Sequence, residues 1–592
     1  MATRTARLDP VTVEIIRSAM ETICYEVATY VGLTATMPVL NQSGERNATI
    51  LDARGRLAAL SVTVPQLMLS STLPVRFALD FFGPGGLQDG DVLIANDPYH
   101  GGGHLPDYNV FAPVVVDGEL RFIVAIQCHH ADTGGAAPGG YMVDALDVWA
   151  EGVRLPALKI VERGVERSDV LYVLKTNSRS PTFLGDVRAQ IVAAQRGRDR
   201  LKGLIAKYGL GAVQGSVERS IEQAGARFRE EVRRWPDGAY FGDAYVDNDP
   251  VGNSDIRVHL KVTVRGDRLT VDFTGSDTRQ NLCANSTYGH TRGYVVAQIA
   301  SMMDPTIPKN EGFVEAIDLI VPKGCCLNPH DNKPVAAGTL HPGVEVGEGI
   351  AKALGDLLPE RSCPQVHKLA MPTVILGMDP GTGRMFIDPS ADTFAAYCGA
   401  AKGLDGWGAM NASFGNLLRA TAEINESIFP HRQMARDYAT DTGGPGQWRG
   451  CPGSFFVKTL TAPATVYAYV VGRKHPMPGM AGGKNGMPNE LRCRVGSKQE
   501  LIAEGASRQV PHHAGESYAY RYGGGGGWGD PLERDPEAVK EDVLDEYVSL
   551  RGARFDYGVV LTGSVEELDV AVDREATREL RAQMRADREG RG

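Results

Sequence analysis

The sequence predicts a mixed α/β (α+β) protein of several domains. Three observations support this fold class: helical apolar repeats between short β-branched runs before residue 235, alternating segments rich in glycine and proline from 236 to 531, and a charged helical stretch after 532. A chain of 592 residues is longer than a single hydrophobic core usually accommodates, so we expect about two to four domains. We predict an α/β domain with a helical extension over 1–235, a β-rich domain over 236–531 and a helical C-terminal segment over 532–592.

The first predicted element is a helix that begins at Pro10. Asp9 precedes it as an N-cap residue, and proline is favoured at the first helical position. A strand at 48–51, a helix at 74–82 and a strand at 91–95 follow. One face of the first helix is predicted to be buried, because apolar residues recur at helical spacing: Val13, Ile16, Met20, Ile23, Val27 and Val31.

Two long helices, at 184–208 and 217–235, are predicted next from their density of good helix formers. Apolar and polar residues then alternate at 258–264 and 269–273 around Gly266-Asp267, which predicts a β-hairpin. Glycine and proline separate short β-runs over 440–529, as expected of a turn-rich sheet region.

The composition excludes several classes of function. A formal net charge of −10 without basic runs argues against nucleic acid or an anionic membrane as a partner. The arginines at 574–591 are interleaved with Asp and Glu at helical spacing, which indicates a solvated helix. Nine scattered cysteines without a CxxC pair fit a reducing compartment. Without an apolar signal segment or a stretch of about 18 apolar residues, the chain is expected to be cytoplasmic.

Two short glycine-framed runs, 96–107 and 129–135, concentrate residues that bind metals. A hairpin should bring the runs together, because β-branched segments at 109–116 and 119–127 flank the turn dipeptide Asp117-Gly118. An unbroken ladder from that turn would pair Asp107 with Cys128 and Pro106 with His129. The runs contain four histidines, of which two lie in each: His100, His104, His129 and His130.

His104, Asp107 and one of His129 or His130 would form a three-ligand metal site with an open position. Imidazole suits zinc and similar ions, and a carboxylate also admits manganese. Strand alternation favours His130 as the neighbour of Asp107. The alternative is that these residues hold loops by hydrogen bonding.

Two acidic residues in the same runs are candidates for catalysis. Asp132 or Asp97 could orient a reacting water or accept its proton. Each also has a structural alternative, because Asp97 precedes Pro98 in a pattern typical of an Asx-turn and Asp132 could cap the turn at 133–135.

The motifs at 96–107, 129–135 and 151–156 together resemble the hydantoinase B/oxoprolinase family, and the blocks at 308–312, 448–450 and 525–535 extend the match in order. The resemblance implies a subunit of ATP-dependent enzymes: hydrolases of hydantoin and N-methylhydantoin, oxoprolinases, lactamases and, more distantly, acetone and acetophenone carboxylases. It implies a hetero-oligomer in which a hydantoinase A-like partner binds ATP and magnesium. The absence of a GxxxxGK(S/T) motif from this chain agrees with that division.

The family's metal ligands map onto His104, Asp107 and His129, and a further family aspartate maps onto Asn47. A fourth ligand would then be an amide oxygen or a water. Choosing His129 over His130 requires a bulge or a strand end near Cys128.

Three hypotheses for function follow. In the first, the divalent ion (zinc or manganese) activates a water that opens a cyclic amide whose carbonyl the partner has phosphorylated. In the second, the same ion holds an enolate of a ketone while carboxyphosphate supplies carbon dioxide. In the third, the chain is a scaffold and the metal only stabilises the hairpin.

Overall fold

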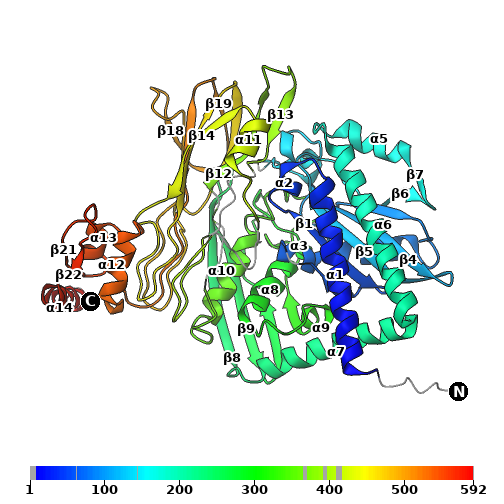
Figure 1. Ribbon diagram of the computed structural model, residues 1–592, viewed down its shortest axis with the longest axis horizontal. Helices are drawn as coiled ribbons and strands as arrows, with labels where there is room; N and C mark the ends of the chain where they lie inside the picture. The colour runs from blue at the N-terminus through cyan, green and yellow to red at the C-terminus, as the bar shows by residue number, and fades with distance from the viewer. Residues whose placement is uncertain are drawn as a thin grey trace.

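The computed structural model describes residues 8–61, 63–142, 144–279, 281–363, 368, 370–390, 397–408 and 417–590. Its helices and several separate sheets confirm the mixed α/β, multidomain class. In Figure 1 the N-terminal helices and a large sheet lie on one side, a second sheet with its helices lies in the centre, and a small C-terminal unit lies at the far side. Among the described helices, none is both long and apolar enough to span a lipid bilayer.

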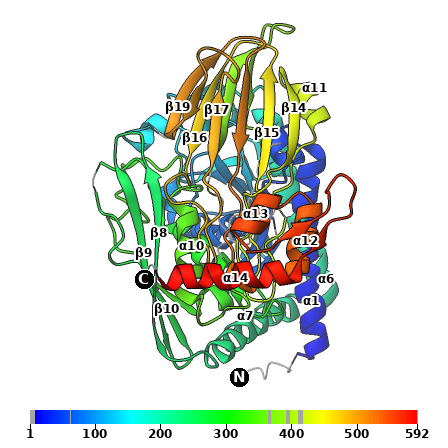
Figure 2. The same cartoon turned by 90° about the vertical axis from the view of Figure 1, so that its left-hand side faces the viewer.

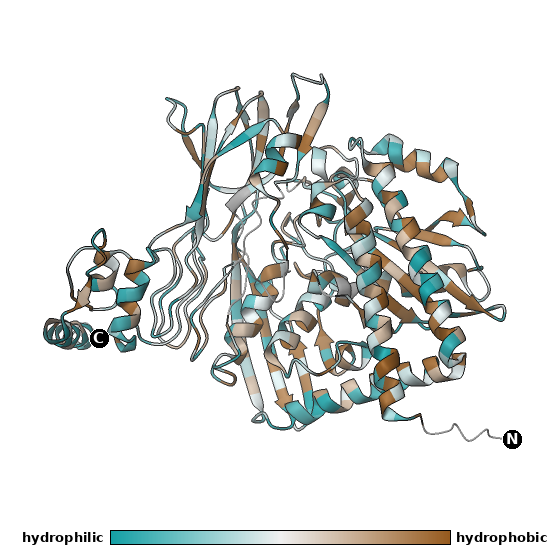
Figure 3. Ribbon diagram, viewed as in Figure 1, coloured by the Kyte–Doolittle hydropathy of each residue, from teal (hydrophilic) through white to brown (hydrophobic). Residues whose placement is uncertain are grey.

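A seven-stranded antiparallel sheet forms the N-terminal layer, and α1 (Pro10–Thr34) and α6 (Phe183–Tyr208) cover one of its faces while α4 (Thr72–Phe82) covers the other. Figure 3 shows the apolar residues concentrated on these strands. Asp9 caps α1, and the six apolar residues predicted to be buried are all buried. In spatial order the strands are β2 (Leu57–Leu60), β1 (Arg46–Asp52), β5 (Glu119–His129), β4 (Asp107–Val116), β3 (Val92–Ala95), β6 (Leu158–Glu162) and β7 (Val165–Glu166).

The hairpin of β4 and β5 forms as predicted, but its register differs from the unbroken ladder. Asp117 and Gly118 both have positive φ, as a tight two-residue turn requires. Two pairs beyond the turn, Arg121 is left without a partner, and the register shifts by one residue. Asp107 therefore pairs with His129. The expected bulge exists, but it lies near the turn and not near Cys128.

The central sheet has the order β11-β10-β9-β8, and the predicted hairpin at 258–273 is its β9 and β10. Trp235 shares one apolar core with residues of these strands, so the domain boundary proposed there crosses continuous packing and stays a prediction. The strands are β8 (Gly238–Asn248), β9 (Ser254–Arg265), β10 (Arg268–Asp272) and β11 (Ile317–Ile320). The longer helices beside them are α7 (Leu210–Val232), α8 (Tyr288–Met302) and α10 (Gly343–Leu354).

Two further sheets complete the β-rich region. The first contains β13 (Met385–Asp388), β12 (Ala370–Met378), β16 (Ala464–Val470) and β19 (Gly505–His512). The second contains β14 (His431–Tyr438), β15 (Ser454–Leu460), β20 (Ser517–Arg521), β17 (Glu490–Cys493) and β18 (Leu501–Ala503). The shorter helices of the chain are α2 (Pro38–Asn41), α3 (Pro65–Ser70), α5 (Ser168–Asn177), α9 (Glu311–Val314) and α11 (Ala422–Ile428).

The glycine-rich stretches between these strands run side by side as extended chains (Figure 1). Their backbones approach so closely that a Cβ on Gly450 would lie 1.9 Å from the carbonyl oxygen of Gly525. A Cβ on Gly526 would lie 1.8 Å from the oxygen of Pro478. Glycine is therefore required here for close backbone packing.

The C-terminal segment is helical as predicted and adds a two-stranded sheet. It contains α12 (Pro536–Leu544), α13 (Leu550–Phe555), β21 (Leu561–Thr562), β22 (Ala571–Val572) and α14 (Arg574–Glu589). Figure 2 shows α14 lying across the front of this unit, and its residues are mostly exposed. Two ion pairs anchor the unit to the β-rich region: Arg534 pairs with Asp405, and Asp542 of α12 pairs with Arg449. Arg534 also pairs with Asp542 within the unit.

Candidate metal centre

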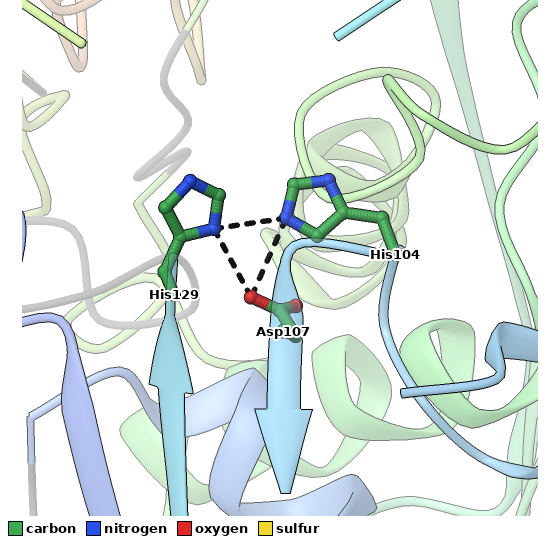
Figure 4. A group of neighbouring side chains, drawn as sticks. All are labelled: His104, Asp107 and His129. Carbon is green, nitrogen blue, oxygen red and sulfur yellow. Dashed lines mark hydrogen bonds and ion pairs between the residues drawn. The ribbon is translucent and has the colours of Figure 1, made fainter. Parts of the chain in front are cut away.

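The hairpin and the loop before it position three side chains at one end of the large sheet. Asp107 is the first residue of β4 and His129 is the last residue of β5, and the register shift makes them direct neighbours. His104 comes from the loop that enters β4. Figure 4 shows the two rings and the carboxylate pointing toward one another.

The three ligand atoms form a compact triangle. His129 Nδ1 lies 3.1 Å from both His104 Nε2 and Asp107 Oδ1, and His104 Nε2 lies 3.4 Å from Asp107 Oδ1. All three residues are buried. Ligand atoms about 2.1 Å from a tetrahedral ion lie about 3.4 Å apart, so this triangle has the size of one face of a metal coordination shell.

Charge and hydrogen bonding both favour a cation here. Burial alone would raise the pKa of Asp107, but His104 and His129 hold it well below its usual range, so the carboxylate is ionised. Burial would lower the pKa of His129, yet the neighbouring acids Glu45 and Asp107 raise it overall. His104 Nδ1 lies 2.9 Å from the carbonyl oxygen of Ala336, so Nδ1–H donates a hydrogen bond to it and Nε2 is directed at the site.

A buried glutamate fixes that carbonyl. Glu151 Oε1 accepts hydrogen bonds of 2.7 Å from the backbone amides of Val335 and Ala336. Glu151 thus orients the segment whose Ala336 carbonyl oxygen contacts His104. Glu151 itself contributes no ligand atom to the triangle. This gives a physical role to the first residue of the motif at 151–156.

The donor set of two imidazoles and one carboxylate fits a divalent ion such as zinc or manganese. A three-residue set leaves one coordination position for water or substrate. Tyr141 packs against both imidazoles, with its ring centroid 5.1 Å from that of His104 and 5.7 Å from that of His129.

Comparison with known proteins assigns the chain to a family. Residues 9–531 match the family model described as hydantoinase B/oxoprolinase. The chain belongs to the hydantoinase B/oxoprolinase family. It is 30% identical to the B-type subunit of a putative D-/L-hydantoinase from Pseudomonas sp. (strain NS671), over 97% of this chain and 98% of that protein. It is also 30% identical to the beta subunit of the caprolactamase from Pseudomonas jessenii, over 94% and 97% of the two chains.

Solved structures of relatives share the fold over nearly the whole chain. The crystal structure of the ATP-dependent caprolactamase from Pseudomonas jessenii superposes with a TM-score of 0.89 at 28% identity, covering 98% of this chain and all of that one. Nucleotide-free acetone carboxylase superposes with a TM-score of 0.87, covering 99% of this chain and 84% of that one. At 20% identity, the second likeness concerns the fold alone.

Within this family member, Asn47 is not available as the fourth ligand predicted from the motif. Its Oδ1 accepts hydrogen bonds from Thr63 Oγ1 and from the amide of Val64, and its Nδ2 donates to Gln127 Oε1 at 2.8 Å. Both amide atoms of Asn47 are therefore engaged in hydrogen bonds within the protein. Asn47 pairs with Gln127, two residue pairs from His129.

The carboxylate that does lie beside the triangle is Glu45, which none of the sequence motifs indicated. The amide of His129 donates to the carbonyl oxygen of Glu45 at 3.2 Å, so the two residues are cross-strand neighbours and their side chains share one face of the sheet. Glu45 is buried, and burial raises its pKa. Alternation along the strand could have found it, because residues 45 and 47 face the same side.

His130 lies on the opposite face of the sheet, which corrects its prediction as an alternative ligand. Its Nε2 lies 2.7 Å from Oε1 of Gln190 on α6, and its ring contacts Tyr108 and Phe183. Burial lowers its pKa. The register shift at Arg121 is the reason, because it exchanges the faces that His129 and His130 occupy relative to Asp107.

Asp97 and Asp132 are both held in hydrogen bonds away from the triangle. Asp97 accepts from the amide of Tyr99 at 2.9 Å, as an Asx-turn does, and pairs with Arg154 at 3.0 Å. Asp132 accepts from the backbone amides of Gly134, Gly139 and Arg179 at 3.2, 2.9 and 2.7 Å. These contacts favour the structural alternatives for both residues over the catalytic ones.

Proposed function

We propose that this chain is the metal-bearing subunit of an ATP-dependent hydrolase of cyclic amides, that is, of hydantoins, N-methylhydantoins or lactams. The observation that carries the proposal is the buried triangle of His104, Asp107 and His129 in a chain that aligns end to end with hydantoinase and caprolactamase subunits. We further propose a hetero-oligomer with a hydantoinase A-like subunit that holds ATP and magnesium, since the relatives are described as subunits.

The separate roles of the two subunits follow from the chemistry of the amide bond. Resonance makes an unstrained ring amide a poor electrophile, and phosphorylation of its carbonyl oxygen by the partner subunit would make the carbon reactive. A divalent ion held by the triangle would lower the pKa of a bound water toward about 7. The water oxygen would then add to this carbon and give up a proton to a protein base, and the ring carbon–nitrogen bond would break as the nitrogen takes up a proton, which leaves an acyl phosphate. A second water would hydrolyse the acyl phosphate to the open-chain carboxylate and phosphate.

Each protein group has a defined part in this step. His104, Asp107 and His129 would hold the ion, and Tyr141 packs against both imidazole rings beside it. We assign Glu45 as the second carboxylate of the centre, placed to accept a proton from the attacking water. Its interactions with His104, Asp107 and His129 support this placement.

The second candidate function is carboxylation of a ketone with the same parts. The delta subunit of acetophenone carboxylase from Aromatoleum aromaticum is 26% identical over 93% of this chain, which supports this candidate, since the site could hold an enolate oxygen instead of a water. The third candidate is a scaffold with a purely structural ion. A shell closed by four protein ligands, with Glu45 as the fourth, would favour this candidate.

One experiment separates the hydrolase from the carboxylase. The chain is purified with its hydantoinase A-like subunit, and ATP hydrolysis is measured against lactams, hydantoins and ketones, with and without 13C-bicarbonate. We expect ATP use that depends on a cyclic amide and an open-chain product without label. Labelled carbon in the product would establish the carboxylase instead.

Removal of the metal with a chelator, followed by melting and turnover measurements, tests the scaffold. Hydrolysis requires turnover to vanish while the fold persists, and to return on addition of zinc or manganese. Loss of folding with unchanged turnover per folded molecule would support the scaffold. His129→Ala should behave like the chelated protein, and His512→Ala, which removes a buried histidine from β19, is the matched control.

A further inference from the structure

A histidine outside the triangle, His290, is fully buried against the metal-binding loop. It lies in the first turn of α8, where its amide donates to the N-cap residue Thr287. The Thr287 hydroxyl donates in turn to the carbonyl oxygen of Gly102 at 3.1 Å. A Cβ on Gly289 would lie 3.0 Å from the oxygen of Gly101. The start of α8 is therefore docked directly on the loop that carries His104.

Three buried polar atoms in this contact have no hydrogen-bond partner within the described structure: Asp107 Oδ2, His290 Nδ1 and His290 Nε2. Asp107 Oδ2 and His290 Nδ1 border the same small space beside Gly103. A Cβ built on Gly103 would lie 2.6 Å from Asp107 Oδ2 and 3.1 Å from His290 Nδ1. Leaving buried polar atoms without partners costs about 1–3 kcal/mol each. An imidazole nitrogen, which donates in one of the two tautomers, and a carboxylate oxygen thus border one gap that glycine alone leaves open.

We propose that His290 is a positioning residue of the metal centre, which donates a hydrogen bond from Nδ1 to Asp107 Oδ2 and so reserves Oδ1 for the ion. The inference rests on the metal centre proposed above. Carboxylate ligands are commonly fixed by a second group, and the loss of such a partner weakens metal binding about 10–100-fold. With Oδ2 engaged, Asp107 binds through a single oxygen, and a coordination position stays open for the reaction.

The competing role for His290 is packing alone. Its ring stacks on Tyr294 at a centroid distance of 5.1 Å, and the Tyr294 hydroxyl donates to the carbonyl oxygen of Thr339. Phenylalanine would preserve this stacking and remove both ring nitrogens. The two roles therefore predict different behaviour for His290→Phe.

The test compares three substitutions by metal affinity, measured as zinc competition with a chromophoric chelator, and by the visible spectrum of the cobalt-loaded protein. His290→Phe removes the donor and should weaken zinc binding about 10–100-fold. His290→Asn places an amide nitrogen near the position of Nδ1 and should restore the affinity to within about threefold. His290→Gln places its amide nearer to Nε2 and should not restore it. The cobalt spectrum should change in the phenylalanine and glutamine variants only.

Each outcome has a defined meaning. If the wild-type protein binds no metal, the metal centre itself fails. If the wild-type protein binds zinc and His290→Phe binds it equally well, the metal centre stands and the role of His290 is refuted. Should the phenylalanine variant not fold, equal affinities of the asparagine and glutamine variants would refute it as well. His512→Phe, which removes another buried histidine far along the chain, controls for general loss of stability.

Discussion

Gly103→Ala tests the metal centre with a single methyl group. The backbone of Gly103 does not have a positive φ, so alanine fits the backbone and the perturbation is the methyl alone. The new Cβ would lie 2.6 Å from Asp107 Oδ2, where an ordinary contact needs 3.4 Å or more. The Asp107 carboxylate must therefore retreat by about 0.8 Å, several times the tolerance of about 0.2 Å on metal–ligand distances.

The magnitude follows from the strain of that displacement. Overpacking of a buried site costs about 1–3 kcal/mol. In the metal-free protein the carboxylate relaxes away from the methyl, but an ion draws it back, so the cost falls on binding and weakens metal affinity roughly 5- to 150-fold. We expect little change in the melting temperature of the metal-free protein.

The assay is zinc titration against a competing chelator, with melting of the chelated protein measured alongside. Gly203→Ala in α6 is the matched control, because nothing lies within 4 Å of its added Cβ. Zinc affinity of Gly103→Ala within twofold of the wild-type value would refute the reasoning, since the methyl cannot be accommodated without moving Asp107.

Three further predictions concern groups outside the triangle. Asp132→Ala should lower the free energy of unfolding by about 3 kcal/mol, seen by chemical denaturation, with zinc affinity unchanged; weaker zinc binding would contradict the structural role. Burial would raise the pKa of Glu345, but His341 and Lys368 lower it to about 2, below its usual 4.5. This ionised group stabilises the fold above pH 4.5 and loses that effect as the pH falls toward 2. Glu345→Gln should therefore flatten the pH dependence of the melting temperature in that window, and an unchanged slope would contradict it. Arg534→Met should expose the C-terminal unit to limited proteolysis, because it removes the anchoring ion pair with Asp405 and the Arg534 partner of Asp542, and an unchanged digestion pattern would argue against this anchor.

The local features of the fold were predictable because they depend on neighbouring residues. The Asp9 cap, the buried face of α1 and the Asp117-Gly118 turn are set within a few residues of sequence, and the structure confirms each. The glycine-rich stretch over 440–529 was predicted as turn-rich sheet. The structure adds that its extended chains approach each other too closely for any side chain.

The register of the hairpin was the first feature that the sequence left open. Pairing was predicted correctly, but the bulge at Arg121 depends on how both strands fit the rest of the sheet, and a shift of one residue exchanges the faces of every side chain beyond it. This shift decides that His129, and not His130, lies beside Asp107.

The sequence by itself determined the family, the first helix with its buried face, the β4–β5 and β9–β10 hairpins, and the histidines and aspartate that could bind an ion. Tertiary structure alone decided which groups surround them: Glu45 across the strand, the Ala336 carbonyl held by Glu151, and His290 at the start of α8. The physical reason is that propensity and hydrophobic period act over a few residues. A contact between a loop near residue 104 and a helix near residue 290 forms only when the whole core packs.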